Sequence, residues 1–166
     1  MPTMRWLPLF ALLFAACATR YTPSPDRPFE PIAAEFQSTH AIVLENDQPP
    51  GEEVVSGPWR IDYRAWTDVA IQITQRELQQ RGMTVTADAP RRLKLALEFA
   101  TTETGWVKIT SEVRLRVETG DGYRAVFTGT NSSTMAANTK RQIDGAMMRV
   151  VVAMLSDPKI TAYLTR

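Results

Sequence analysis

LKLALEFA, residues 93–100, and VKITSEVRLRV, residues 107–117, alternate apolar residues with polar or small ones. Successive side chains of an extended chain point to opposite faces, so this alternation predicts two strands with one face inward and one in water. A turn around Thr104-Gly105 would pair them as an antiparallel hairpin. The predicted inward row is Leu93, Leu95, Leu97, Phe99, Val107, Ile109, Val113, Leu115 and Val117, with Ser111 as its polar break.

The outward row of the same hairpin is charged. It holds Lys94, Glu98, Lys108, Glu112, Arg114 and Arg116. Because both signs are mixed along it, we interpret this row as a solvated sheet face rather than a binding surface.

Further elements flank the hairpin on both sides. Before it, residues 40–45 read as a strand, and a helix capped by Asp62 runs to Arg81 and ends at Gly82. After it, Gly120-Asp121-Gly122 predicts a tight turn into another strand. The last third shows helical spacing of apolar residues, with a short final helix after Asp157-Pro158.

The order of these elements is strand, helix, strands, helix. It predicts an α+β fold, with a mostly antiparallel sheet of four or five strands and two main helices on one face.

The N-terminus has the three parts of a secretory signal. Arg5 precedes an apolar run over residues 6–14, and Ala15 and Ala16 lead directly to Cys17, the only cysteine. The run is shorter than the roughly 20 residues that a spanning helix needs. This stretch resembles the lipobox of bacterial lipoproteins, although Phe14 stands where that family usually has Leu. The resemblance implies a signal peptide over residues 1–16 and acyl chains on Cys17.

The resemblance implies that the protein is located at a membrane of the bacterial envelope. Ala18 stands where an Asp would imply retention in the inner membrane, so the resemblance implies the outer membrane, with the domain facing the periplasm. Residues 17–33 are rich in proline and predict an extended tether that holds the domain off the bilayer. Residues 34–166 then form a single α+β domain.

One candidate binding residue lies in the stretch 46–60. This stretch reads as a long irregular loop, and Trp59 within it could serve as an anchor for a protein partner. The alternative is that Trp59 packs against the first helix near Trp66.

The sequence shows no motif that is typical of a catalytic or metal-binding site. It has no phosphate-binding loop, nucleophile elbow or zinc spacing, and His40 is the only histidine. We therefore expect no catalytic residue, no metal, no cofactor and no enzyme activity. Nineteen Lys and Arg against eighteen Asp and Glu give no basic excess, so we expect no nucleic-acid partner.

With these features in place, the chain resembles small Gram-negative outer-membrane lipoproteins of the YajG-like group. The likeness covers residues 93–164, including the hairpin, Ile143-Asp144-Gly145-Ala146-Met147 and the ending from Leu155 to Leu164. The chain is also similar to the auxiliary lipoproteins of ABC-type lipid-transport systems. The first resemblance implies a non-enzymatic accessory or scaffold module, and the second a subunit of a lipid-transport complex. Both imply an envelope protein partner, and a homo-oligomer is a further alternative.

Overall fold

The computed structural model describes residues 18–26, 36–134 and 139–166. Its main sheet has five strands in the order β5-β2-β6-β7-β8, and a smaller sheet has the order β1-β4-β3. The main strands are β2 (Ala41–Asn46), β5 (Thr84–Val85), β6 (Arg91–Thr104), β7 (Ile109–Thr119) and β8 (Arg124–Ser133). The smaller sheet consists of β1 (Thr19–Arg20), β3 (Glu53–Ser56) and β4 (Trp59–Asp62).

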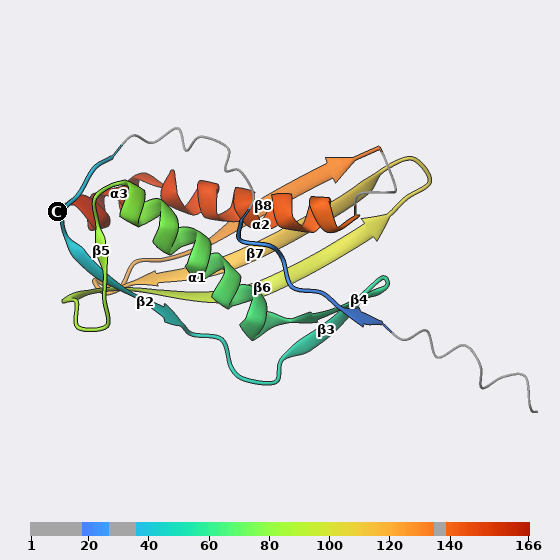
Figure 1. Ribbon diagram of the computed structural model, residues 1–166, viewed down its shortest axis with the longest axis horizontal. Helices are drawn as coiled ribbons and strands as arrows, with labels where there is room; N and C mark the ends of the chain where they lie inside the picture. The colour runs from blue at the N-terminus through green and yellow to red at the C-terminus, as the bar shows by residue number, and fades with distance from the viewer. Residues whose placement is uncertain (1–17, 27–35, 135–138) are drawn as a thin grey trace, which may run out of the picture.

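Two long helices cover one face of the main sheet (Figure 1). These are α1 (Tyr63–Gln80) and α2 (Thr139–Leu155), and the short helix α3 (Pro158–Thr165) follows α2. The predicted α+β class and the two covering helices are therefore confirmed. The sheet is less uniform than predicted, because β2 runs parallel to both β5 and β6, and β1 runs parallel to β4. The small second sheet was not predicted.

The parallel pairing follows from the connection between the strands. Parallel neighbours need a crossover that returns the chain to the same end, and α1 lies between β2 and β6 in the chain. Local signals position this helix as predicted. The Asp62 carboxylate accepts a hydrogen bond from the Ala65 amide at 3.0 Å, and Gly82 adopts a φ of 87° just past the helix end.

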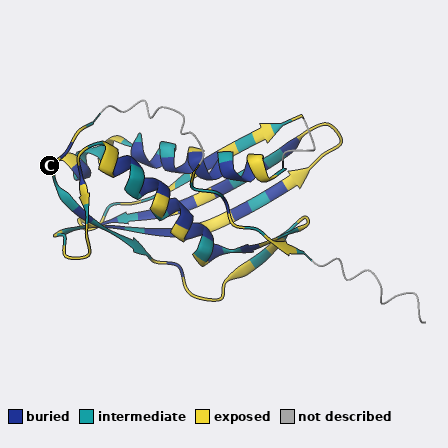
Figure 2. Ribbon diagram, in the orientation of Figure 1, coloured by how far each residue is buried: buried dark blue, intermediate teal, exposed yellow. Residues whose placement is uncertain are grey.

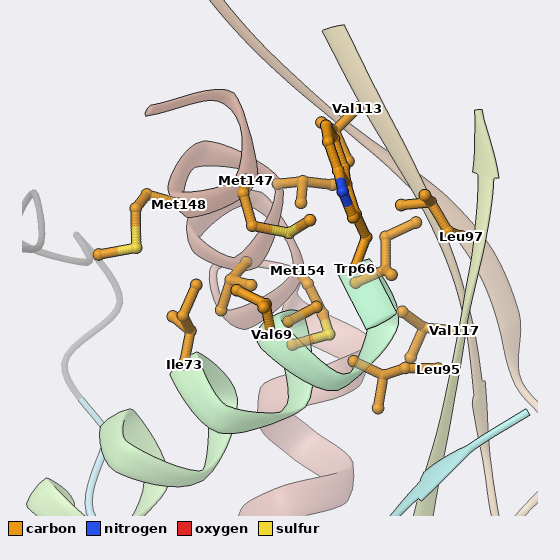
Figure 3. Close-up of a cluster of buried hydrophobic side chains, with 14 of the residues drawn as sticks. Trp66, Val69, Ile73, Leu95, Leu97, Val113, Val117, Met147, Met148 and Met154 are labelled. Atoms are coloured by element: carbon orange, nitrogen blue, oxygen red, sulfur yellow. The ribbon is translucent and has the colours of Figure 1, made fainter. Parts of the chain in front are cut away.

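The hydrophobic core lies between the two helices and the sheet. Figure 3 shows Trp66, Val69 and Ile73 of α1 facing methionines of α2 and the inward side chains of β6 and β7. Trp66 is 1% exposed, and Ile73 and Met147 are fully buried. Figure 2 shows the alternation of buried and exposed residues along the long strands.

The alternation in β6 changes phase at one residue. Leu97 pairs with Leu115 but Phe99 pairs with Arg114, so Glu98 is an extra residue and forms a β-bulge. Phe99 is consequently 37% exposed on the outer face, where the Arg114 guanidinium lies 4.8 Å from the ring centre. The prediction that Phe99 points inward is wrong for this reason.

Val107 also departs from the predicted inward row. It lies in the turn between β6 and β7, before the first residue of β7, and is 72% exposed. Ser111 does lie on the inward face, where its hydroxyl oxygen is 3.0 Å from that of Thr102.

α2 and β8 approach each other closely at Gly129. A Cβ atom at this position would lie 2.2 Å from the Ala146 carbonyl oxygen and 2.3 Å from the Val150 amide nitrogen. Only a residue without a side chain fits there. On the helix side, Gly145 faces Asn131 of β8.

Candidate functional site

The segment that follows Cys17 is built into the folded domain. β1 pairs with β4 in parallel, with Thr19 opposite Trp59 and Arg20 opposite Arg60. The Thr19 amide donates to the Pro58 carbonyl at 2.8 Å, and the Tyr21 amide donates to that of Arg60 at 3.3 Å. Over residues 18–26 the structure therefore shows a docked strand and its continuation where the sequence suggested a free tether.

Tyr21 is the main contact of this segment with the domain. Its ring centre lies 5.4 Å from that of Trp59, and its carbonyl accepts a 2.7 Å hydrogen bond from the Trp66 indole nitrogen. Its hydroxyl donates to Asp144 Oδ1 at 2.7 Å. Tyr21 thus connects the small sheet with both long helices.

Asp144 gives the segment a buried polar partner. The residue is 2% exposed within α2, and besides the Tyr21 hydroxyl its Oδ1 accepts from the Ser24 amide at 3.0 Å. A buried carboxylate without donors would strongly destabilise the fold. Residues 21–24 therefore supply part of the hydrogen bonding that this helix position requires. We call the contacts of Tyr21 and Ser24 with Trp59, Trp66 and Asp144 the anchor junction.

Trp59 lies in a strand and not in an irregular loop. Val54 and Val55 of β3 pair with Ile61 and Arg60, and Gly57-Pro58 forms a two-residue turn with a Gly57 φ of 57°. The prediction of an irregular stretch is therefore wrong for residues 53–60.

The Trp59 side chain is partly buried beside Tyr21. Its indole nitrogen is buried and has no hydrogen-bond partner. The partner-binding role of Trp59 stays a prediction, and the packing shows that the side chain also belongs to the anchor junction.

Cys17 itself lies outside the described residues. In the sequence it is two positions before Thr19, the first residue of β1. An acyl group on Cys17 would therefore be attached beside the β1–β4 end of the domain.

Two hollows open elsewhere on the surface. One, of about 380 Å³, is lined by Gln48, Pro49, Glu52, Leu97, Glu98 and Arg116. The other, of about 450 Å³, lies beside α3 and includes Tyr123, Lys159 and Tyr163. Burial raises the pKa of the Tyr123 phenol, and the nearby Asp157 carboxylate raises it further, so this group is a neutral donor at pH 7.

Neither hollow presents a set of reactive groups. Within residues 18–26, 36–134 and 139–166, no three His, Cys, Asp or Glu side chains are grouped to hold a metal ion. None of the helices in these ranges is long and apolar enough to cross a membrane. We take the anchor junction as the candidate site.

Two residues of the junction were missed by the sequence analysis, although each left a signal. Tyr21 is the single aromatic residue among the polar and proline residues of 18–26, and such a residue seldom stays in water without a role. Asp144 interrupts an apolar helical stripe between Ile143 and Ala146, which signals a buried acid with a distant partner.

Comparisons with known proteins show a shared fold. No protein-family model matches the chain, and no curated protein matches its sequence. Among solved structures, the protein XCC0632 from Xanthomonas campestris, of family DUF330, superposes with a TM-score of 0.60 at 18% identity. The match covers 87% of this chain and 97% of that one. The hypothetical protein CT253 from Chlamydia trachomatis gives a TM-score of 0.48 at 9% identity, over 76% of this chain and 98% of that one.

We expect the contacts of the anchor junction to stabilise the folded domain. We expect Tyr21→Ala to lower the free energy of unfolding by about 2 kcal/mol, since it removes a partly buried ring and leaves Asp144 short of a donor. Thr22→Ala, at an exposed neighbouring position, should stay within about 0.5 kcal/mol of the wild type. Urea unfolding of the wild type and of each variant, all as the chain from residue 18 onward, measures both changes in the free energy of unfolding. Equal midpoints for the two variants would show that the segment is a free tether.

Proposed function

We propose that the chain is a lipid-anchored envelope lipoprotein that acts as a non-enzymatic accessory or scaffold module. The support comes from the N-terminal sequence together with the anchor junction. Residues 1–16 have the features of a signal peptide, Cys17 stands at the expected acylation position, and the next residues are built into the fold. Acyl chains on Cys17 would then orient the domain as well as retain it.

The proposed location is the outer membrane, with the domain on its periplasmic side. This part rests on the sorting position, where Ala18 replaces the Asp that retains lipoproteins in the inner membrane. Several acyl chains on one cysteine contribute about 0.8 kcal/mol per buried methylene, which is enough for permanent attachment.

A second candidate function is that of an auxiliary subunit in an ABC-type lipid-transport complex. The main sheet favours it, because none of the described helices covers its outer face, which carries the exposed apolar side chains Phe99 and Val126. Such a face is suited to contact with another subunit. Recovery of a permease or a substrate-binding protein with the solubilised chain would support this candidate over a general scaffold.

Replacing the acylated residue tests the lead proposal. We expect Cys17→Ala to abolish incorporation of labelled palmitate and to release the chain from the membrane fraction. The domain should keep its melting temperature, because Cys17 precedes every residue of the anchor junction. Incorporation of palmitate into the variant, or retention of the variant in washed membranes, would contradict the proposal.

A further inference from the structure

We propose that the β6–β7 turn is a second membrane contact, in which Trp106 and Val107 enter the lipid interface and fix the tilt of the anchored domain. This inference rests on the proposed function, because it assumes an anchor at Cys17. The partner is the lipid bilayer in which that anchor lies.

The turn presents its two apolar side chains fully to the outside. The Gly105 amide donates to the Lys108 carbonyl at 2.8 Å, which closes a four-residue turn with Trp106 and Val107 at its corners. Trp106 has a relative exposure of 105%, the highest of the large exposed hydrophobic side chains of the described chain, and Val107 is 72% exposed. Neither side chain contributes to the core, so packing does not explain their presence in the turn.

β1, the strand that follows Cys17 in the sequence, and this turn lie at the same end of the molecule. The β3–β4 turn, which β1 adjoins through Pro58, touches β6 where Ser56 Oγ accepts from the Thr102 amide at 2.9 Å. Thr102 is two residues before the end of β6 at Thr104 and four residues before Trp106, so the two positions are at most about 13 Å apart. Figure 1 shows the β6–β7 turn extending beyond the β3–β4 turn at the end where the chain enters β1.

The composition of this end matches a lipid interface. Val55 on β3 is 64% exposed, so three of the five large exposed hydrophobic side chains among the described residues, Val55, Trp106 and Val107, belong to this end. Tryptophan is enriched where a protein meets lipid headgroups, because its ring is apolar and its N–H is polar.

The charges at this end also favour anionic headgroups. Arg20 and Arg60 both form ion pairs with the single carboxylate of Glu53, so these three side chains together carry one net positive charge. Lys108 adds a cation within the turn, and Lys140 lies over the Tyr21 ring at 5.5 Å. Basic residues beside a membrane attract anionic lipids.

The short connection to the anchor decides in favour of lipid over a protein partner. With Thr19 paired to β4, a lipid on Cys17 brings this end of the domain to within a few residues' length of the bilayer.

The test compares the two ends of β6. Trp106→Cys and Asp88→Cys place a single new thiol before β7 and before β6. Both positions are exposed and lie beyond opposite ends of β6, a strand of 14 residues that spans about 45 Å. Each acylated full chain is labelled with the polarity-sensitive fluorophore NBD and reconstituted in vesicles of phosphatidylethanolamine and phosphatidylglycerol. We expect NBD emission at position 106 to rise severalfold over that in the detergent-solubilised chain diluted into buffer, and to be quenched by nitroxide-labelled lipid. Emission at position 88 should not change.

The failures of the two proposals are distinguishable in the same samples. If Cys17 is not acylated, the wild-type chain takes up the thiol label and no palmitate, which contradicts the proposed function. If palmitate is incorporated but position 106 stays in water, or both positions respond equally, the membrane contact is overturned. A response at 106 that requires added envelope protein would assign the turn to a protein partner and would also overturn it.

Discussion

Replacing Gly129 by alanine should cost the domain about 3 kcal/mol or more of folding free energy. The new Cβ would lie 2.2 Å from the Ala146 carbonyl oxygen and 2.3 Å from the Val150 amide nitrogen, well inside contact distance. Both are backbone atoms of α2, so no side-chain rotation relieves the overlap, and the helix must move away from β8. Overpacking of a close contact costs typically about 1–3 kcal/mol, and a clash with backbone lies at the upper end of that range. Urea unfolding followed by circular dichroism measures the loss.

Gly145→Ala is the matched control on the other side of the same contact. The added methyl group would meet the Asn131 side chain, whose terminal amide can rotate away. Alanine in a helix interior is also favoured over glycine by about 1 kcal/mol. The two effects oppose each other, so this variant should remain within about 1 kcal/mol of the wild type. Equal losses for the two variants would mean that the approach of α2 to β8 is not limited by Gly129.

Leu115→Asp should prevent folding altogether. Leu115 is fully buried in β7, so the change removes its apolar burial and places an unpaired carboxylate in the core. The sum of about 2–3 kcal/mol for the lost burial and several more for the buried charge matches the total stability of a small domain, about 5–15 kcal/mol.

Arg114→Ala tests the opposite face at the next residue. Arg114 is half exposed, pairs with Glu112 at 2.7 Å and covers the Phe99 ring, contacts that are each worth only about 0.5–1 kcal/mol at the surface. The Arg114→Ala variant should keep a cooperative thermal unfolding transition, with a melting temperature near that of the wild type. A folded Leu115→Asp protein with a similar melting temperature would contradict the assignment of the two sheet faces.

Period-two alternation was enough to predict the long strands. The side chains of Leu93, Leu95 and Leu97 on β6, and of Val113 and Leu115 on β7, are buried as that alternation requires. The pattern failed at Phe99 because a bulge shifts the phase by one residue, and nothing in the composition around Glu98 marks the extra residue.

Pairings between distant segments were the main part that the sequence did not show. β2 next to β6, and β1 next to β4, join residues far apart in the chain, and parallel neighbours leave no turn signature between them. The β3–β4 hairpin did leave a signal, since Gly57-Pro58 separates two short segments, EVVS and WRID, that each contain two apolar residues. Their length of four residues each is too short for alternation to distinguish them from a loop.

The residues of the anchor junction could not be assembled from the sequence alone. The acylation of Cys17 stays a prediction from the residues around it. Tyr21 and Asp144 acquire their roles only through a contact between segments that are more than a hundred residues apart. Trp106 follows a glycine in a turn, and the turn is visible in the sequence, but its position at the same end of the molecule as β1 depends on how the two sheets are placed.

The sequence separation between paired strands also predicts the order in which parts of the domain fold. β6, β7 and β8 form consecutive hairpins whose loops close at little entropic cost, and α2 packs on them directly afterwards. By contrast, β1 pairs only with the more distant β4 in the described chain, and β2 pairs only with β5 and β6, which lie beyond α1. Since contacts between distant residues form slowly, we expect the C-terminal half to supply the folding nucleus. The N-terminal strand leaves the ribosome first and would be the last part to reach its native position.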